Sequence, residues 1–210
     1  LISDEVYTII SKCTNNGNVT GNGNNAGGFI GLVGAGTVLL IECINNGHIQ
    51  KFDSAGGFVG YTYGISVHMT ISNCTNNGPV TGNTGVGGFI GMISSLIVSV
   101  KVNIINSANK ATVSAERDLA CGLFCMSLSH MSISFSVLNS LNKGDVTVQY
   151  PQGVAYGIAS VVTKAKSVVN VGSVSGSTDS RTFWEICNDA EFIFGLKKNS
   201  VQDENTRLIT

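Results

Sequence analysis

Five charged residues in two short segments are the side chains of this chain whose types could support polysaccharide cleavage. The segments read Lys51-Phe52-Asp53 and Glu116-Arg117-Asp118. Glycoside hydrolysis needs two carboxyl groups roughly 5–10 Å apart, so Asp53 and Asp118 are the candidate pair if the fold brings them together. Both segments are more simply interpreted as charged loop residues that face only solvent, because such loops contain the same types of residue.

The cysteines do not follow the spacing of a metal site. Neither Cys121 nor Cys125 has the second Cys pair or the His pair that zinc usually requires. We expect buried, small apolar residues, and bridges between neighbouring turns remain the alternative. The full set is Cys13, Cys43, Cys74, Cys121, Cys125 and Cys187. The sequence also lacks the His-Glu-x-x-His, Gly-x-Ser-x-Gly and phosphate-loop motifs, so we predict no metal, no cofactor and no enzymatic activity.

An internal repeat of about thirty residues must position any functional side chain. One asparagine returns six times, with a small residue two positions later and a β-branched apolar residue four positions later. A fixed period of this length is typical of repeat architectures. The asparagines are Asn15, Asn45, Asn76, Asn109, Asn142 and Asn170, and the apolar residues are Val19, Ile49, Val80, Val113, Val146 and Val174.

Each repeat contains an alternating strand, the asparagine segment and a strand that begins with glycine. Such a unit cannot bury its apolar side alone, whereas stacked copies pair equivalent strands in parallel and form a continuous core. The sequence therefore predicts an all-β fold, a parallel β-solenoid of about six coils, right-handed because parallel crossovers usually are. Equivalent asparagines should form a ladder of amide hydrogen bonds, and we expect them or the following glycines to adopt the left-handed backbone at a corner. Phe29, Phe58, Phe89, Leu123 and Ile158 should form a second inward ladder.

The repeats define two segments of the chain. Residues 1–178 carry the solenoid pattern, and 179–210 lack it and contain the only tryptophan, Trp184. Solenoids need an atypical unit to cover an open end, so we expect 179–210 to be a C-terminal cap. The chain begins without Met in what reads as mid-strand, and we expect it to be a fragment of a longer polypeptide.

The glycine-led strands resemble GLUG-type repeats. The resemblance rests on 26–31, which reads Ala-Gly-Gly-Phe-Ile-Gly, on its two close copies, and on the Cys-Thr-Asn-Asn-Gly segments of 13–21 and 74–82. It is good over 9–91, fades through 92–176 and does not cover 177–210. Such repeats occur in large secreted or cell-surface proteins of bacteria and parasitic protists, including adhesin-like proteins, where they form stalk or display material. The resemblance implies an extracellular or cell-surface location and offers no catalytic residues.

Composition narrows the choice of partners. Charged residues make up 12% of the 210 residues and the net charge is −1, which disfavours nucleic acid, and no apolar run is long enough to cross a membrane. We therefore predict a rigid extracellular scaffold that acts in adhesion or binds a host or matrix glycan or protein. The alternatives are a polysaccharide-cleaving enzyme and a rod that associates end to end.

The variable loops are the expected contact sites, because repeat scaffolds diversify in their loops. The residues are Lys51, Asp53, Glu116, Arg117, Asp118 and Tyr150. Two sequons offer glycosylation sites at Asn18 and Asn73, and we expect Asn18 to be the more accessible of the two because Asn73 precedes a core cysteine.

Overall fold

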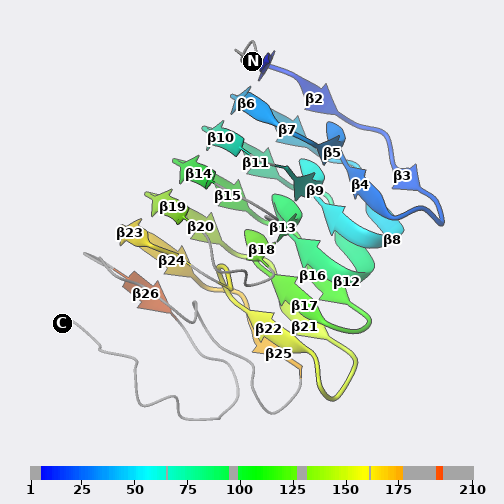
Figure 1. The fold of residues 1–210 in the computed structure, drawn as a ribbon. Helices are drawn as coiled ribbons and strands as arrows, with labels where there is room; N and C mark the ends of the chain where they lie inside the picture. The colour runs from blue at the N-terminus through cyan, green and yellow to red at the C-terminus, as the bar shows by residue number, and fades with distance from the viewer. Residues whose placement is uncertain are drawn as a thin grey trace.

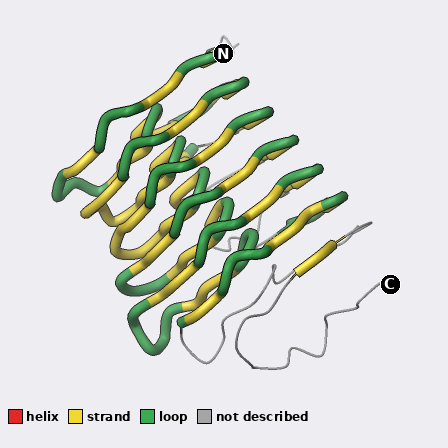
Figure 2. Tube along the Cα trace, turned by 180° about the vertical axis from the view of Figure 1, so that it is seen from behind, coloured by secondary structure: helices red, strands yellow, loops and turns green. Residues whose placement is uncertain are grey.

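The computed structural model is a parallel β-solenoid, and it describes residues 6–64, 66–94, 99–126, 132–160, 162–176 and 193–195. Four sheets run along its axis, and every strand in them pairs in parallel with an equivalent strand of the next coil. Figure 1 shows the coils stacked from the N-terminal end downward, and Figure 2 shows the same stack from behind. The fold class predicted from the repeat is therefore confirmed.

Sheets A and B form two adjoining sides of the solenoid. Sheet A contains β1 (Tyr7–Ser11), β6 (Gly36–Ile41), β10 (Ser66–Ser72), β14 (Ser99–Ile105), β19 (Ser132–Leu138) and β23 (Lys164–Lys166). Sheet B contains β2 (Thr14–Asn15), β7 (Ile44–Asn45), β11 (Thr75–Asn76), β15 (Ala108–Asn109), β20 (Leu141–Asn142), β24 (Val168–Asn170) and β26 (Ile193–Gly195).

Sheets C and D complete each coil. Sheet C contains β3 (Val19–Thr20), β4 (Asn25–Gly27), β8 (Ile49–Gly56), β12 (Val80–Gly87), β16 (Val113–Ala115), β17 (Leu119–Cys121), β21 (Val146–Val148), β22 (Val154–Tyr156) and β25 (Val174–Ser175). Sheet D contains β5 (Ile30–Val33), β9 (Val59–Tyr63), β13 (Ile90–Ser94) and β18 (Phe124–Met126).

The asparagine ladder forms as the repeat predicts. In each of the five steps from Asn15 to Asn170, one side-chain Nδ2 donates to the Oδ1 of the next asparagine at 2.8 Å. The steps span 28 to 33 residues, which is the length of one turn of the solenoid. From Asn45 onward the asparagines are fully buried, and each also donates to the carbonyl oxygen two residues later.

The second glycine of the glycine-led strand makes room for this ladder. A Cβ added to Gly28 would lie 2.7 Å from the Oδ1 of Asn45, and one added to Gly57 would lie 2.7 Å from the Oδ1 of Asn76. A Cβ added to Gly88 would likewise press on the side chain of Asn109, and one added to Gly122 would press on that of Asn142. The two halves of the repeat therefore pack on each other inside the solenoid, which explains why glycine recurs at this position.

The left-handed corner lies at a different place from the predicted one. Among the described non-glycine residues, positive φ angles fall on the residue just before each Cys/Ser position or its equivalent. They do not fall on the ladder asparagines or on the glycines that follow them. The residues are Lys12, Glu42, Asn73, Asn106, Asn139 and Ser167, with φ between 47° and 54°. The prediction was wrong because Asn45 and its equivalents use their side chains as buried donors within β-strands, while the chain turns between sheets A and B.

The predicted inward ladders form the core. Ile49, Val80, Val113 and Val146 are fully buried, and Val19 and Val174 at the two ends are partly buried. Phe58 stacks between Phe29 and Phe89 with ring centroids 5.1 and 5.0 Å apart. Leu123 and Ile158 continue that column in the next coils and are also buried.

The cysteines of the described residues are free thiols, as the simpler interpretation expected. Cys43, Cys74, Cys121 and Cys125 are buried, whereas Cys13 of the first coil is exposed. Burial raises the pKa of the Cys74 thiol to about 11. Burial and then the neighbouring Cys121 side chain raise the pKa of Cys125. These thiols are therefore protonated packing residues at neutral pH.

The predicted C-terminal cap lies almost wholly outside the described residues. Within 179–210 only β26 is described, and it extends sheet B by pairing Val168 with Ile193 and Asn170 with Gly195. The capping role and the hand of the coil stay predictions.

Candidate functional site

The variable segments of the repeats lie together along one edge of the solenoid, within sheet C, and we call this the loop edge. In the second and third coils they belong to the continuous strands β8 and β12, and in the other coils they are loops between two short strands. The amide of Asp53 donates to the Gly23 carbonyl of the first coil. The amide of Arg117 donates to the carbonyl of Asn83, and the amide of Val154 donates to that of Asp118. Consecutive loops are thus held in register by backbone hydrogen bonds, as the repeat predicts.

Asp53 accepts two side-chain hydrogen bonds from the next coil on this edge. Its Oδ1 accepts a hydrogen bond of 3.0 Å from Asn83 Nδ2 of the next coil, and its carbonyl oxygen accepts one of 2.9 Å from Thr84 Oγ1. Both bonds are exposed to solvent. The sequence pointed to Asp53 but not to Asn83 and Thr84, which carry no charge. Their offset of 30 and 31 residues from Asp53 is the signal that would have placed them here.

The other predicted contact residues occupy the next two loops. Glu116, Arg117 and Asp118 are exposed and form the turn between β16 and β17. Tyr150 is 47% exposed, and its carbonyl oxygen accepts a hydrogen bond from the amide of Gly153 within the following loop. Lys51 lies in the same strand as Asp53, β8.

The two candidate carboxylates share one column but are separated by a full coil. Asp53 precedes Ser54, Asp118 precedes Leu119, and both of these residues pair with Gly85 of the intervening strand β12. Two steps of about 4.8 Å place the two backbones about 10 Å apart. Inverting glycosidases place their two carboxyl groups roughly 6.5–9.5 Å apart. The spacing of the Asp53 and Asp118 backbones slightly exceeds that range, and Thr84 lies on the coil between them.

The sequence also raised the questions of metal binding, membrane insertion and glycosylation. No group of three or more His, Cys, Asp or Glu residues that could hold a metal ion occurs in the part of the chain that the structure describes. The described residues also include no helix long and apolar enough to span a membrane. Both sequon asparagines, Asn18 and Asn73, are exposed. The expectation that Asn73 is the less accessible of the two stays a prediction. Asn73 has a left-handed φ of 54°, and the adjacent Cys74 is buried.

The side chain of Asn18 also makes a hydrogen bond to the next coil. Its Oδ1 accepts a hydrogen bond of 2.9 Å from the backbone amide of His48 in the next coil. A glycan on the Asn18 nitrogen would leave this oxygen in place as an acceptor.

The first coil exposes apolar side chains. Tyr7 and Ile9 of the outermost described strand, β1, are 63% and 64% exposed, and Val6 just before it is 65% exposed. Among the described strands β1 pairs only with β6. A strand edge with apolar neighbours is a site for pairing with another chain.

Comparison with known proteins gave no match. No family model, no curated protein and no solved structure is significantly similar to this chain.

Proposed function

We propose that this chain is a non-enzymatic, rigid repeat scaffold of a secreted or cell-surface protein, which displays binding loops in adhesion or ligand recognition. The observation that carries the proposal is the edge on which the loops of successive coils are held in register by hydrogen bonds between coils. A scaffold of this kind loses little conformational entropy when it binds, and its loops present several contacts at once.

The extracellular location is proposed from the sequence. The segments 13–21, 26–31 and 74–82 resemble GLUG-type repeats, and two exposed sequons are compatible with glycosylation of a secreted protein. Asparagine ladders, glycine packing and a stacked aromatic column favour a mechanical role, because each adds interactions between neighbouring coils.

An array of glycans and matrix proteins tests the function. We expect binding without cleavage, and we expect the double change Asp53→Ala and Arg117→Ala to weaken it. The matched control is Asn16→Ala, since Asn16 is an exposed residue outside the loop edge. If the protein cleaves an arrayed polysaccharide and the cleavage is lost in Asp53→Asn or Asp118→Asn, the protein is an enzyme and the proposal of a non-enzymatic scaffold is wrong. Binding to nothing on the array would contradict a recognition role.

Self-association through the first coil is a second candidate, favoured by the exposed Tyr7 and Ile9 of β1. Sedimentation across a concentration series tests it. A mass that rises with concentration in the parent protein but not in Ile9→Lys would support the rod, and a constant monomer mass would remove it.

A further inference from the structure

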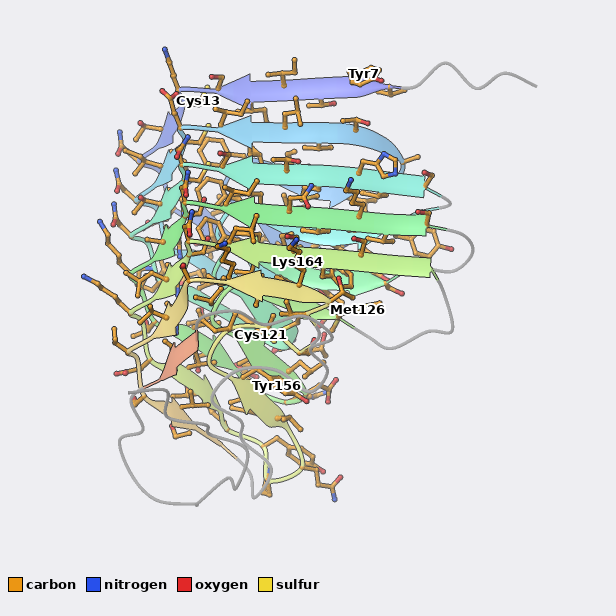
Figure 3. The ribbon with its side chains drawn as sticks, turned by 90° about the vertical axis from the view of Figure 1, so that its left-hand side faces the viewer. Tyr7, Cys13, Cys121, Met126, Tyr156 and Lys164 are labelled. Carbon is orange, nitrogen blue, oxygen red and sulfur yellow. The ribbon has the colours of Figure 1, made fainter. Side chains whose placement is uncertain are left out.

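Five exposed lysines gather on the outer faces of sheets A and B in the later coils. Lys101 lies on β14, Lys164 and Lys166 lie on β23, and Lys110 and Lys143 directly follow β15 and β20. Figure 3 looks onto sheet A and shows Lys164 on the face turned toward the viewer. We call these five residues the lysine face.

The solenoid brings Lys110 and Lys143 together although they are far apart in the sequence. Asn109 pairs with Asn142, so Lys110 and Lys143 are neighbours on consecutive coils, about 4.8 Å apart along the axis. Lys164 and Lys166 are two residues apart on one strand and therefore point to the same side, about 7 Å apart. The lysine face therefore extends both along the solenoid axis and along the direction of the strands.

Carboxylates are few on these surfaces in the part of the chain that the structure describes. None of the described strands of sheets A and B contains Asp or Glu. Among the acids at their corners, Glu42 lies 4.0 Å from Lys12 in the first coils. Asp145 accepts hydrogen bonds from the amide and the hydroxyl of Ser173. The acidic residues of the loop edge, Asp53, Glu116 and Asp118, lie on sheet C instead.

Neutral hydrogen-bonding side chains lie between the cations. Thr70, Asn103, Ser134 and Ser136 occupy the outward positions of the central strands of sheet A, and Asn103 Nδ2 donates to Thr70 Oγ1 at 3.4 Å. Such a surface offers charge to anions and amide or hydroxyl groups to sugar hydroxyls.

We propose that the lysine face binds an acidic polysaccharide that lies along sheets A and B. This proposal rests on the proposed recognition function and adds the lysine face to the loop edge as a second contact surface. Double-stranded DNA fits less well, because it carries one charge per about 1.7 Å and is read mainly through arginine. The lysine face spaces its cations more widely and contains no arginine. A polymer with one carboxylate for every one or two sugars matches that lower density.

Binding of the intact chain to immobilised polygalacturonate and hyaluronate tests the proposal, with neutral dextran as the reference polymer. We expect binding that weakens as salt rises, because the contacting charges are exposed and screened. Each charge reversal, Lys101→Glu, Lys143→Glu or Lys164→Glu, should weaken binding several-fold, and the triple variant roughly tenfold or more. Circular dichroism confirms that these exposed changes leave the fold intact.

Lys12→Glu is the matched control, since it is also exposed and makes the same change in net charge on the first coil. An equal loss of binding in Lys12→Glu would overturn the proposed role of the lysine face, because the loss would then come from the change in net charge alone. Absence of binding to both acidic polymers would overturn it too. Tighter binding to a DNA duplex or to anionic phospholipid vesicles than to either polymer would show that the partner is of another class.

The loop edge gives an independent outcome. If Arg117→Ala abolishes binding and the lysine reversals do not, the recognition function stands and the lysine face is refuted. If the lysine reversals abolish it and Arg117→Ala does not, the lysine face is the contact surface and the loop edge is not.

Discussion

Replacing Asn76 by alanine tests whether the asparagine ladder stabilises the solenoid. Asn76 is fully buried, donates to Asn109 Oδ1 at 2.8 Å and to the Gly78 carbonyl at 3.0 Å, and accepts from Asn45 Nδ2 at 2.8 Å. Alanine removes all three bonds and leaves three polar groups without these partners in an interior that water does not reach. Each unsatisfied buried group costs about 1–3 kcal/mol, so we expect the three together to lower the free energy of unfolding by about 3–9 kcal/mol.

The neighbouring Asn77 supplies the matched control. Its Nδ2 donates to Asn46 Oδ1 at 2.9 Å in a second ladder, but that bond is exposed and water can replace it. Asn77→Ala should change stability by no more than about 0.5 kcal/mol. Both variants are measured by urea denaturation with linear extrapolation. A difference below about 1 kcal/mol between Asn76→Ala and Asn77→Ala would refute the claim that burial gives the inner ladder its importance.

Asn76→Asp tests the hydrogen-bond donors of the side chain separately from its size. Aspartate keeps the size of asparagine, but its carboxylate cannot donate to Asn109 or Gly78, and burial would raise its pKa above the ordinary value of about 4. The sign follows from linkage: an acid with a raised pKa in the folded state loses stability as pH rises, because the unfolded chain releases its proton first. Asn76→Asp should therefore be less destabilised at pH 4 than at pH 8. An equal loss at both pH values would contradict the donor argument.

Three further predictions concern the glycines, the aromatic column and the thiols. Gly57→Ala should lower the free energy of unfolding by about 3 kcal/mol or more, because the new Cβ would press on Asn76 and on the Gly88 carbonyl. Gly31→Ala should be tolerated, since its nearest neighbour would be 3.5 Å away, and equal melting temperatures for the two variants would contradict this account. Phe58→Ala should cost about 3–5 kcal/mol in urea denaturation and Phe29→Ala clearly less, because only Phe58 is stacked on both sides. Stability should also fall as pH rises from about 9 to about 11, where the unfolded Cys74 thiol ionises before the buried one. A Cys74→Ser variant with an unchanged alkaline unfolding curve would count against that assignment.

The sequence predicted which residues stack along the axis. The intervals between Asn15, Asn45 and Asn76 equal one turn, so an amide ladder, an aliphatic ladder and an aromatic ladder follow from counting alone. The same counting placed the loops of Asp53 and Asp118 in one column, because parallel coils in register bring equivalent positions together.

Only the tertiary structure decided which columns face each other across the coil and which face solvent. The packing of Gly28 against Asn45, and the left-handed angle at Glu42 instead of at the asparagine, depend on where the chain bends between sheets. The lysine face has the same origin: Lys101 and Lys164 lie at different repeat positions and share a surface because β14, β19 and β23 pair side by side in sheet A. A period fixes the vertical neighbours of each residue, whereas its lateral neighbours depend on the path of the backbone within one turn.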